Sequence, residues 1–311
     1  MKFPKKLRIG DTIGLVAPSS AVSKERAEQS ILALESLGFF VKAADNLSTD
    51  WHCLAAGPAK LRADWVNRMF ADPEVDAIFC IRGGDCSSRI MQYLDYDIIR
   101  KNPKIFVGYS DITNLHIGIS QNCGFVTFHG PMVSSNIVDD FDQQTMMSLF
   151  STLNAEGEFV FQNPKGCELE VYREGKKKKV KGTLTGGNLS LIAASLATPF
   201  EIDTRNKVLF IEETGERVSM IEKYMMHLKN AGLFDRASAL LLGQFTNEKI
   251  NCAPDFDSIA CIKDITEDLP IPVIFGVQSG HDHTVPMMTL PVGAECIVDT
   301  EKKEIRFQAD R

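Results

Sequence analysis

Residues 104–113 have the sequence Lys-Ile-Phe-Val-Gly-Tyr-Ser-Asp-Ile-Thr. An apolar strand at 105–107 leads into a helix predicted over 112–121, and Ser110 stands at the turn between them. Such a turn can lift a hydroxyl above the edge of a sheet, where backbone N–H groups face the atom it attacks. Serine is also a good helix N-cap. Because Ile112 replaces the second glycine of a G-x-S-x-G turn, the N-cap interpretation is the stronger one on spacing alone.

The stretches around this segment alternate between strand and helix patterns. Apolar runs predict strands at 12–17, 39–43, 75–81, 105–107 and 126–128, and helical spacing predicts helices after Ser23, around Trp65, and over 87–94, 112–121 and 142–153. Strands this apolar are covered on both faces. The pattern predicts an α/β fold, with an N-terminal doubly wound, mostly parallel sheet over residues 1–153.

The second half of the chain differs from the first in composition and in its pattern of predicted strands and helices. Residues 154–182 are polar and rich in glycine, proline and lysine, which indicates a linker. Residues 183–311 predict a smaller mixed α/β domain with barrel-like strands. The expected elements are strands at 208–211, 240–243 and 273–275, helices near 189–196, 219–230 and 258–269, and a closing hairpin over 295–299 and 304–308.

Composition limits the classes of function. A formal net charge of −7 argues against a nucleic-acid partner, and the lysine run 176–179 is interpreted as a solvated loop. No stretch approaches the roughly 18 apolar residues of a membrane span, and no apolar segment follows the charged start, so we expect a cytoplasmic protein without a membrane partner. The eight cysteines form no C-x-x-C pair, which favours reduced thiols.

A pair of glycines follows the strand predicted at 75–81. The segment 81–85 reads Ile-Arg-Gly-Gly-Asp. Ligands of open parallel sheets bind beyond the carboxyl ends of strands, and glycines let a substrate approach the backbone. An ordinary tight turn explains Gly83 and Gly84 equally well.

Several motifs in collinear order resemble the LD-carboxypeptidase family, which also includes the microcin-immunity peptidases. The resemblance rests on segments 10–19 (GDTIGLVAPS), 72–84 (DPEVDAIFCIRGG), 107–113 (VGYSDIT), 128–132 (FHGPM), 182–189 (GTLTGGNL), 209–213 (LFIEE), 280–281 (GH) and 290–293 (LPVG).

The resemblance implies a role for each matched residue. Ser110 corresponds to the nucleophile, Glu212 to the acid and His281 to the base of a Ser–Glu–His triad. The first domain would carry the nucleophile, and the second the acid and base. The backbone N–H groups of Gly84 and Asp111 correspond to the oxyanion hole.

The implied activity is that of a serine carboxypeptidase in cell-wall recycling. It would hydrolyse the bond between an L-centre, of lysine or diaminopimelate, and the C-terminal D-alanine of a murein tetrapeptide. The resemblance implies a small peptide substrate, a homodimer, and no metal or organic cofactor.

Two residues depart from the family pattern, in which Tyr-Gly commonly follows Arg-Gly-Gly. Here Asp85 and Cys86 follow. Asp85, with Gly83, falls in the expected substrate-binding loop, where its charge would repel a substrate carboxylate. It could instead point to solvent or cap the helix predicted from Ser87. Cys86 is a weaker candidate for the nucleophile than Ser110.

One acidic residue and several histidines have more than one possible role. Glu213 competes with Glu212 for the role of the acid, since on a strand the two point to opposite faces. His281 and His283 could form a metal pair, although no third ligand stands out. His116 and His129 are better explained by packing or hydrogen bonding. Two further functions are open, an immunity-type peptidase that cleaves peptidyl-nucleotide antibiotics and a non-catalytic peptide-binding sensor.

Overall fold

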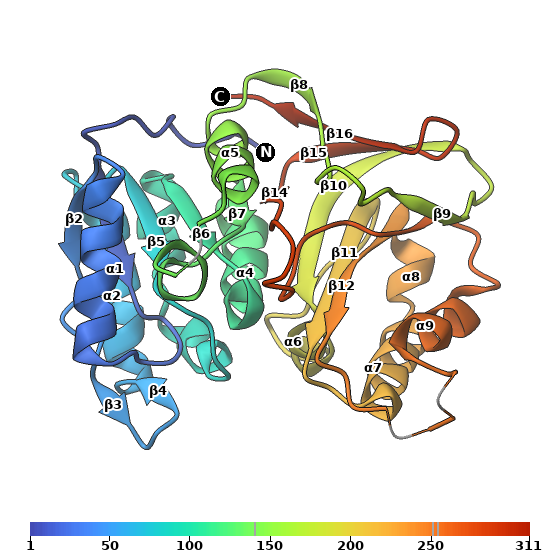
Figure 1. Cartoon of the computed structure of the whole chain (residues 1–311), viewed down its shortest axis with the longest axis horizontal. Helices are drawn as coiled ribbons and strands as arrows, with labels where there is room; N and C mark the ends of the chain where they lie inside the picture. The colour runs from blue at the N-terminus through green and yellow to red at the C-terminus, as the bar shows by residue number, and fades with distance from the viewer. Residues whose placement is uncertain (140, 251, 254) are drawn as a thin grey trace. The chain divides into compact units, whose positions relative to one another are not determined.

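The computed structural model describes residues 1–139, 141–250, 252–253 and 255–311 and divides the chain into two compact units (Figure 1). One unit comprises Met1–Ala155, Thr289–Gly293 and Asp310–Arg311, and the other comprises Glu156–Met288 and Ala294–Ala309. The sequence predicted domains over 1–153 and 183–311, with a linker over 154–182.

The first unit is built on a six-stranded sheet in the order β14-β7-β6-β5-β1-β2. In this sheet β2, β1, β5, β6 and β7 are parallel to one another, and β14 joins antiparallel to β7. Every residue of β5 and β6 is buried, as expected for strands covered on both faces. The bounds are β1 Thr12–Val16, β2 Phe40–Ala43, β5 Ala77–Cys80, β6 Ile105–Gly108, β7 Thr127–His129 and β14 Leu290–Val292, beside a small pair, β3 Asp50–Trp51 and β4 Ala55–Ala56.

The strand order creates a switch point between β1 and β5. From β1 the chain passes outward through α1 (Lys24–Ser36) to β2, then returns past β1 through α2 (Ala59–Ala71) to β5. It continues in that direction through α3 (Tyr96–Lys101) and α4 (Thr113–Cys123). Right-handed crossovers in opposite directions place α1 on one face and α2, α3 and α4 on the other. In such sheets the ligand crevice lies beyond the carboxyl ends of the strands at the switch.

Local capping explains several helix boundaries in this unit. Ser23 caps α1 by accepting a hydrogen bond from the Arg26 N–H at 3.1 Å. Asp142 caps α5 (Gln143–Leu153) in the same way, through the N–H groups of Gln144 and Thr145. The helix predicted over 87–94 is a 3-10 helix, Ser87–Tyr93, which is preceded by no side-chain cap.

The second unit contains an eight-stranded mixed sheet in the order β8-β16-β15-β10-β11-β12-β13-β9. Strands β10 to β13 are parallel, and the outer strands are antiparallel. The predicted closing hairpin is confirmed as β15 and β16. Where barrel-like strands were expected, the described residues form one sheet with β8 and β9 at its edges. The bounds are β8 Gly157–Val160, β9 Glu170–Arg173, β10 Lys179–Asn188, β11 Lys207–Thr214, β12 Ala239–Thr246, β13 Val273–Phe275, β15 Glu295–Asp299 and β16 Glu304–Ala309.

The expected linker over 154–182 therefore contributes strands β8 and β9 and the start of β10. Their residues are mostly exposed or half-buried, as edge strands permit, so their polar sequence hides the strand pattern.

The helices of this unit are α6 Leu189–Ser195, α7 Val218–Asn230, α8 Leu233–Arg236 and α9 Ser258–Thr266. Helix α7 buries Val218, Ile221, Met225 and Leu228, whose spacing of three and four residues forms one apolar stripe. It contacts α6, α8 and α9. The part of the chain that the structure describes contains no helix that combines the length and apolarity of a membrane span.

Candidate active site

Ser110 lies at the carboxyl end of β6 in a strained backbone conformation. Its φ is +62°, in the left-handed region that residues other than glycine rarely adopt. It is the first residue of a 3-10 helix, Ser110–Ile112, and the N-cap position belongs to Tyr109. The interpretation of Ser110 as a helix N-cap is therefore wrong. Strain of this kind persists where the surrounding structure imposes it, and it is concentrated at functional sites.

Of the two glycines after β5, Gly83 lies directly against this turn and Gly84 lies against the loop after β1. A Cβ atom on Gly83 would lie 3.1 Å from Ser110 Oγ and 3.5 Å from the Asp111 backbone nitrogen. Gly84 has φ +153°, and a Cβ there would lie only 2.0 Å from Ser20 Oγ. A Cβ at position 84 would overlap Ser20, and one at position 83 would make a tight contact with Ser110. The glycines thus bring the loop after β5 against both the hydroxyl of Ser110 and the loop after β1.

The buried side chain of Asp111 ties three loops together at the same edge of the sheet. Its carboxylate accepts hydrogen bonds from the Ser19 hydroxyl, from the Cys86 N–H at 2.9 Å, and from the Ser87 N–H at 2.7 Å. Burial raises the pKa of Asp111, and the hydrogen bonds from Ser19 and Ser87 oppose that rise. Sequence reasoning missed this role and assigned only the backbone N–H of Asp111.

Arg62, on α2, donates hydrogen bonds to the loops after β1 and β5 and to the segment before α2. Its side chain is 1% exposed and donates to the carbonyls of Gly57, Pro18 and Cys86, the last two at 2.6 and 3.1 Å. Burial lowers the pKa of Arg62. A helical pattern at 59–71 indicated the helix, but no local signal could have shown where this guanidinium reaches.

The two residues that depart from the family pattern have different surroundings. Asp85 is exposed, whereas Cys86 is buried, with 4% of its surface exposed. Burial raises the pKa of the Cys86 thiol. Because the thiolate is the nucleophilic form, this environment disfavours Cys86 as a nucleophile.

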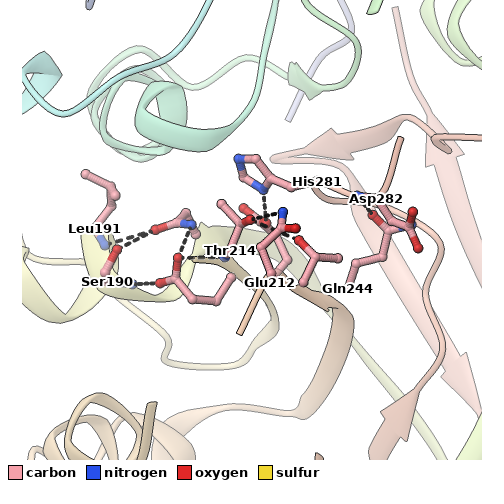
Figure 2. Close-up of polar contacts among 11 residues, drawn as sticks. Ser190, Leu191, Glu212, Thr214, Gln244, His281 and Asp282 are labelled. Atoms are coloured by element: carbon pink, nitrogen blue, oxygen red, sulfur yellow. Dashed lines mark hydrogen bonds and ion pairs between the residues drawn. The ribbon is translucent and has the colours of Figure 1, made fainter. Parts of the chain in front are cut away.

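In the second unit, Glu212 and His281 form a close pair (Figure 2). His281 Nδ1 lies 2.7 Å from Glu212 Oε2, and the Glu212 side chain has no exposed surface. Burial lowers the pKa of His281, but attraction to Glu212 and Glu213 and the hydrogen bond to Glu212 outweigh it, so the pKa is raised overall. With Nδ1 donating to the carboxylate, Nε2 is the nitrogen that can take up a proton.

Glu213 has a structural task on the other side of the strand. It accepts hydrogen bonds from the Asn188 amide at 2.9 Å and from the N–H groups of Ser190 and Thr214, both at 2.8 Å. Asn188 is the N-cap of α6, so Glu213 anchors the start of that helix. Burial is the main cause that raises the pKa of Glu213, followed by the nearby Glu212. Of the two carboxylates, Glu212 is the one bonded to His281.

Gln244, on β12, holds the loop that carries His281. Its Oε1 accepts from the Asp282 N–H at 2.9 Å, and its Nε2 donates to Gln278 Oε1 at 3.1 Å. Its backbone N–H donates to the Ser279 carbonyl at 3.2 Å. These contacts hold the loop on both sides of the imidazole, and Figure 2 shows the one between Gln244 and Asp282. Gln244 was missed because only the fold brings β12 to this loop.

The remaining histidines that the sequence singled out occupy different settings. His281 and His283 lie in a loop rather than on a strand, so the strand geometry behind the metal-pair hypothesis is absent. Among the residues that the structure describes, no cluster of three His, Cys, Asp or Glu could hold a metal ion. His116 is buried and bonds Thr127 Oγ1 and the Gly108 carbonyl, and burial lowers its pKa to about 4. His129 is buried and packs edge-on against Tyr109.

Two family models match the chain. The LD-carboxypeptidase N-terminal domain matches residues 13–130, which include Ser110, and the LD-carboxypeptidase C-terminal domain matches residues 181–298, which include Glu212 and His281. The chain belongs to the LD-carboxypeptidase family.

Individual members of the LD-carboxypeptidase family are similar over the whole chain. A Bacillus subtilis protein named probable murein peptide carboxypeptidase is 39% identical, covering 98% of this chain and 94% of the relative. The solved structure of MccF in complex with glutamyl sulfamoyl guanosine matches with a TM-score of 0.90 at 26% identity, covering 100% of this chain and 99% of that one. The muramoyltetrapeptide carboxypeptidase from Oxalobacter formigenes matches with a TM-score of 0.82 at 26% identity, covering 96% and 99%.

Proposed function

We propose that this protein is a serine-type LD-carboxypeptidase that releases the C-terminal D-alanine of a murein tetrapeptide. The bond cleaved joins D-alanine to an L-centre of lysine or diaminopimelate. The proposal is supported by the names of the relatives from Bacillus subtilis and Oxalobacter formigenes. The observation that carries it is the 2.7 Å contact between His281 Nδ1 and Glu212 Oε2, which supplies a general base in a chain whose Ser110 occupies a strained turn.

In the proposed mechanism, Ser110 Oγ attacks the carbonyl carbon of the scissile amide and its proton passes to His281 Nε2. Glu212 accepts the hydrogen bond of His281 Nδ1–H, which fixes the tautomer and stabilises the imidazolium. His281 then gives the proton to the nitrogen of D-alanine as the C–N bond breaks. A water molecule hydrolyses the resulting acyl-serine ester, with His281 acting again as base and then as acid.

The backbone N–H groups of Gly84 and Asp111 are the proposed donors to the oxyanion. Donors that are fixed in place before the reaction stabilise the tetrahedral intermediate without reorganising. Support comes from the close packing of Gly83 and Gly84 against Ser110 and Ser20, and from the anchored Asp111 side chain. Gly83 and Asp85 belong to the same loop and are proposed to contact the substrate.

The proposal is tested by incubating the protein with a muramoyl tetrapeptide that ends in D-alanine and measuring free D-alanine. Release is expected from the wild type and is expected to fall by at least about 10³-fold in His281→Gln, because the base is lost. A tetrapeptide that ends in L-alanine is the matched control substrate. Equal release from both peptides, or no release from either, would overturn the assignment of substrate.

The second candidate is a microcin-immunity type of peptidase, which the TM-score of 0.90 to the MccF complex favours. The murein peptidase ranks first because the Bacillus subtilis relative named probable murein peptide carboxypeptidase is 39% identical, whereas the MccF of that complex is 26% identical. Glutamyl sulfamoyl guanosine is the probe, and free glutamate is the readout. Faster release of glutamate than of D-alanine would reverse the ranking, and tight binding of either ligand without turnover would indicate a sensor.

A further inference from the structure

A basic pocket lies in the second unit, at the amino ends of its parallel strands. Lys176, Lys177, Lys179 and Lys181 line it, and it has a volume of about 580 Å³. The segments before β11, β12 and β13 complete its wall, including Asn206, Ser238 and residues 270–272. We call it the lysine pocket. Glu212 lies near the carboxyl end of β11, so the lysine pocket is at the opposite edge of the sheet from the Glu212–His281 pair.

The backbone of the lysine run is anchored to the sheet. The Lys176 N–H donates to the Pro270 carbonyl at 2.9 Å, and the Lys178 carbonyl accepts from the Thr300 N–H at 2.8 Å. Gly175 has φ +67°, and a Cβ there would lie 2.6 Å from the Pro272 nitrogen, so this segment packs tightly on the pocket wall. Residues 176–178 form an exposed loop, as predicted, and the exposed Lys179 begins β10. The hydrogen bonds of Lys176 and Lys178 hold the backbone of this loop in place.

The charges in this region are unevenly neutralised. Lys178 pairs with Glu174 and Glu301, and Lys181 pairs with Glu295. In the described part of the chain, Lys176, Lys177 and Lys179 form no ion pair within 4.0 Å. None of the residues that line the pocket is acidic. Four lysine side chains therefore line one pocket of a protein whose net charge is −7.

We propose that the lysine pocket binds a small, multiply charged anion that carries phosphate or carboxylate groups. Lysine ammonium groups are point charges suited to such oxygens, and Asn206 and Ser238 add neutral polar side chains. The volume is within the range of small-molecule sites, roughly 300–1,000 Å³. Ala237, Val180 and the prolines at 270 and 272 give the wall an apolar part, which suits an organic anion. The site is separate from the proposed peptidase chemistry.

Calorimetric titration of the full chain with inorganic pyrophosphate, and separately with citrate, tests the proposal at constant ionic strength. Saturable binding of at least one probe, at one site per chain, is expected. The triple variant Lys176→Gln/Lys177→Gln/Lys179→Gln should bind at least about tenfold more weakly. The matched control, Lys24→Gln/Lys60→Gln/Lys101→Gln, removes the same charge from exposed positions of the first unit and should bind within about twofold of the wild type.

The stronger probe identifies phosphate or carboxylate as the ligand chemistry. In the wild type, the bound probe should also slow hydrogen exchange of the backbone at 175–181, a readout that needs no substitution. Absence of saturable binding of both probes up to about 10 mM would overturn the proposal. Equal weakening in the two triple variants would overturn it too, because net charge rather than the lysine pocket would then govern binding.

Discussion

The serine turn of the first unit and the Glu212–His281 pair of the second are positioned by different kinds of force. Ser110 owes its place to backbone geometry: a positive φ, two close-packed glycines, and loops tied to the Asp111 carboxylate. His281 owes its state to electrostatics, since a fully buried carboxylate lies 2.7 Å from its ring. Apart from loss of the Ser110 hydroxyl itself, substitutions around the serine turn should therefore act through backbone geometry, and those at Glu212 and His281 through protonation.

The largest effect is expected from removing the Ser110 hydroxyl. Ser110→Ala should lower kcat by at least about 10⁴-fold, since the acyl intermediate cannot form. Ser110→Gly should be equally inactive but about 1 kcal/mol more stable than Ser110→Ala, because glycine adopts φ +62° without strain. D-alanine release and urea unfolding measure the two effects. Full activity in Ser110→Ala would refute the role of the hydroxyl, and equal stability of the two variants would refute the strain.

The next largest effect is expected at the acid. Glu212→Gln should lower kcat by about 10²- to 10⁴-fold, since the imidazolium loses its partner. Glu213→Gln should lower kcat less than about tenfold and destabilise the fold by about 1–2 kcal/mol, because it disturbs the anchor of α6. The reverse ranking of activities would reassign the acid to Glu213.

The pH dependence of kcat/KM tests the same pairing of Glu212 with His281. Below its pKa His281 is protonated and cannot accept the serine proton, so kcat/KM should fall with acidification through a pKa raised above the ordinary 6.5. Residual activity of Glu212→Gln should have its acid limb at lower pH, since the carboxylate that raises the pKa is gone. An unchanged limb in that variant would show that another group controls the profile.

A smaller effect is expected on the pH dependence of stability. It comes from His116, the buried histidine of the first unit, whose pKa is lowered whereas that of His281 is raised. Burial holds the pKa of His116 at about 4, below the 6.5 of an unfolded chain, so the folded state binds fewer protons. This contribution to stability is fully present above pH 6.5 and is lost as the pH falls toward 4, amounting to about 3 kcal/mol. In His116→Gln, the free energy of unfolding should depend less on pH over this range. The same slope in both proteins would contradict the lowered pKa.

The smallest expected effect is the difference in stability between alanine substitutions at two glycines of positive φ. Gly84→Ala should destabilise the protein by about 2 kcal/mol more than Gly124→Ala, because a Cβ at position 84 meets Ser20 Oγ at 2.0 Å while one at position 124 meets nothing within 4 Å. Activity should fall in Gly84→Ala alone. Equal losses of stability and activity would mean that backbone strain, rather than the close approach to Ser20, decides both.

The sequence predicted β5, β6, β11 and β12 well because most of their residues are buried and form continuous apolar runs. The strand and helix around Ser110 follow from this pattern, as does the strand that leads to Glu212. The parallel strand β10 was not predicted, since the first half of it is polar and exposed or half-buried. The edge strands β8 and β9 were predicted as linker because exposed positions carry polar residues. Strand β14 was missed because it joins β7 across more than half the chain, a pairing that local periodicity cannot reveal.

The sequence indicated which residues are candidates for the site, but not the contacts that hold them in place. Family motifs pointed to Ser110, Glu212 and His281. The strained φ of Ser110, the carboxylate of Asp111 beneath the loops, and the clamp from Gln244 depend on contacts between segments far apart in sequence. Spacing alone favoured an N-cap for Ser110, because a serine before a helix has the same local pattern whether it caps or reacts.

The most direct test of the central claim is covalent labelling by a fluorophosphonate that reacts with activated serines. Mass spectrometry should locate the adduct on Ser110 in the wild type, and the labelling rate should fall by at least about 10²-fold in His281→Gln and in Glu212→Gln. Labelling of a different residue, or of Ser110 at the wild-type rate in His281→Gln, would contradict activation of this serine by the Glu212–His281 pair.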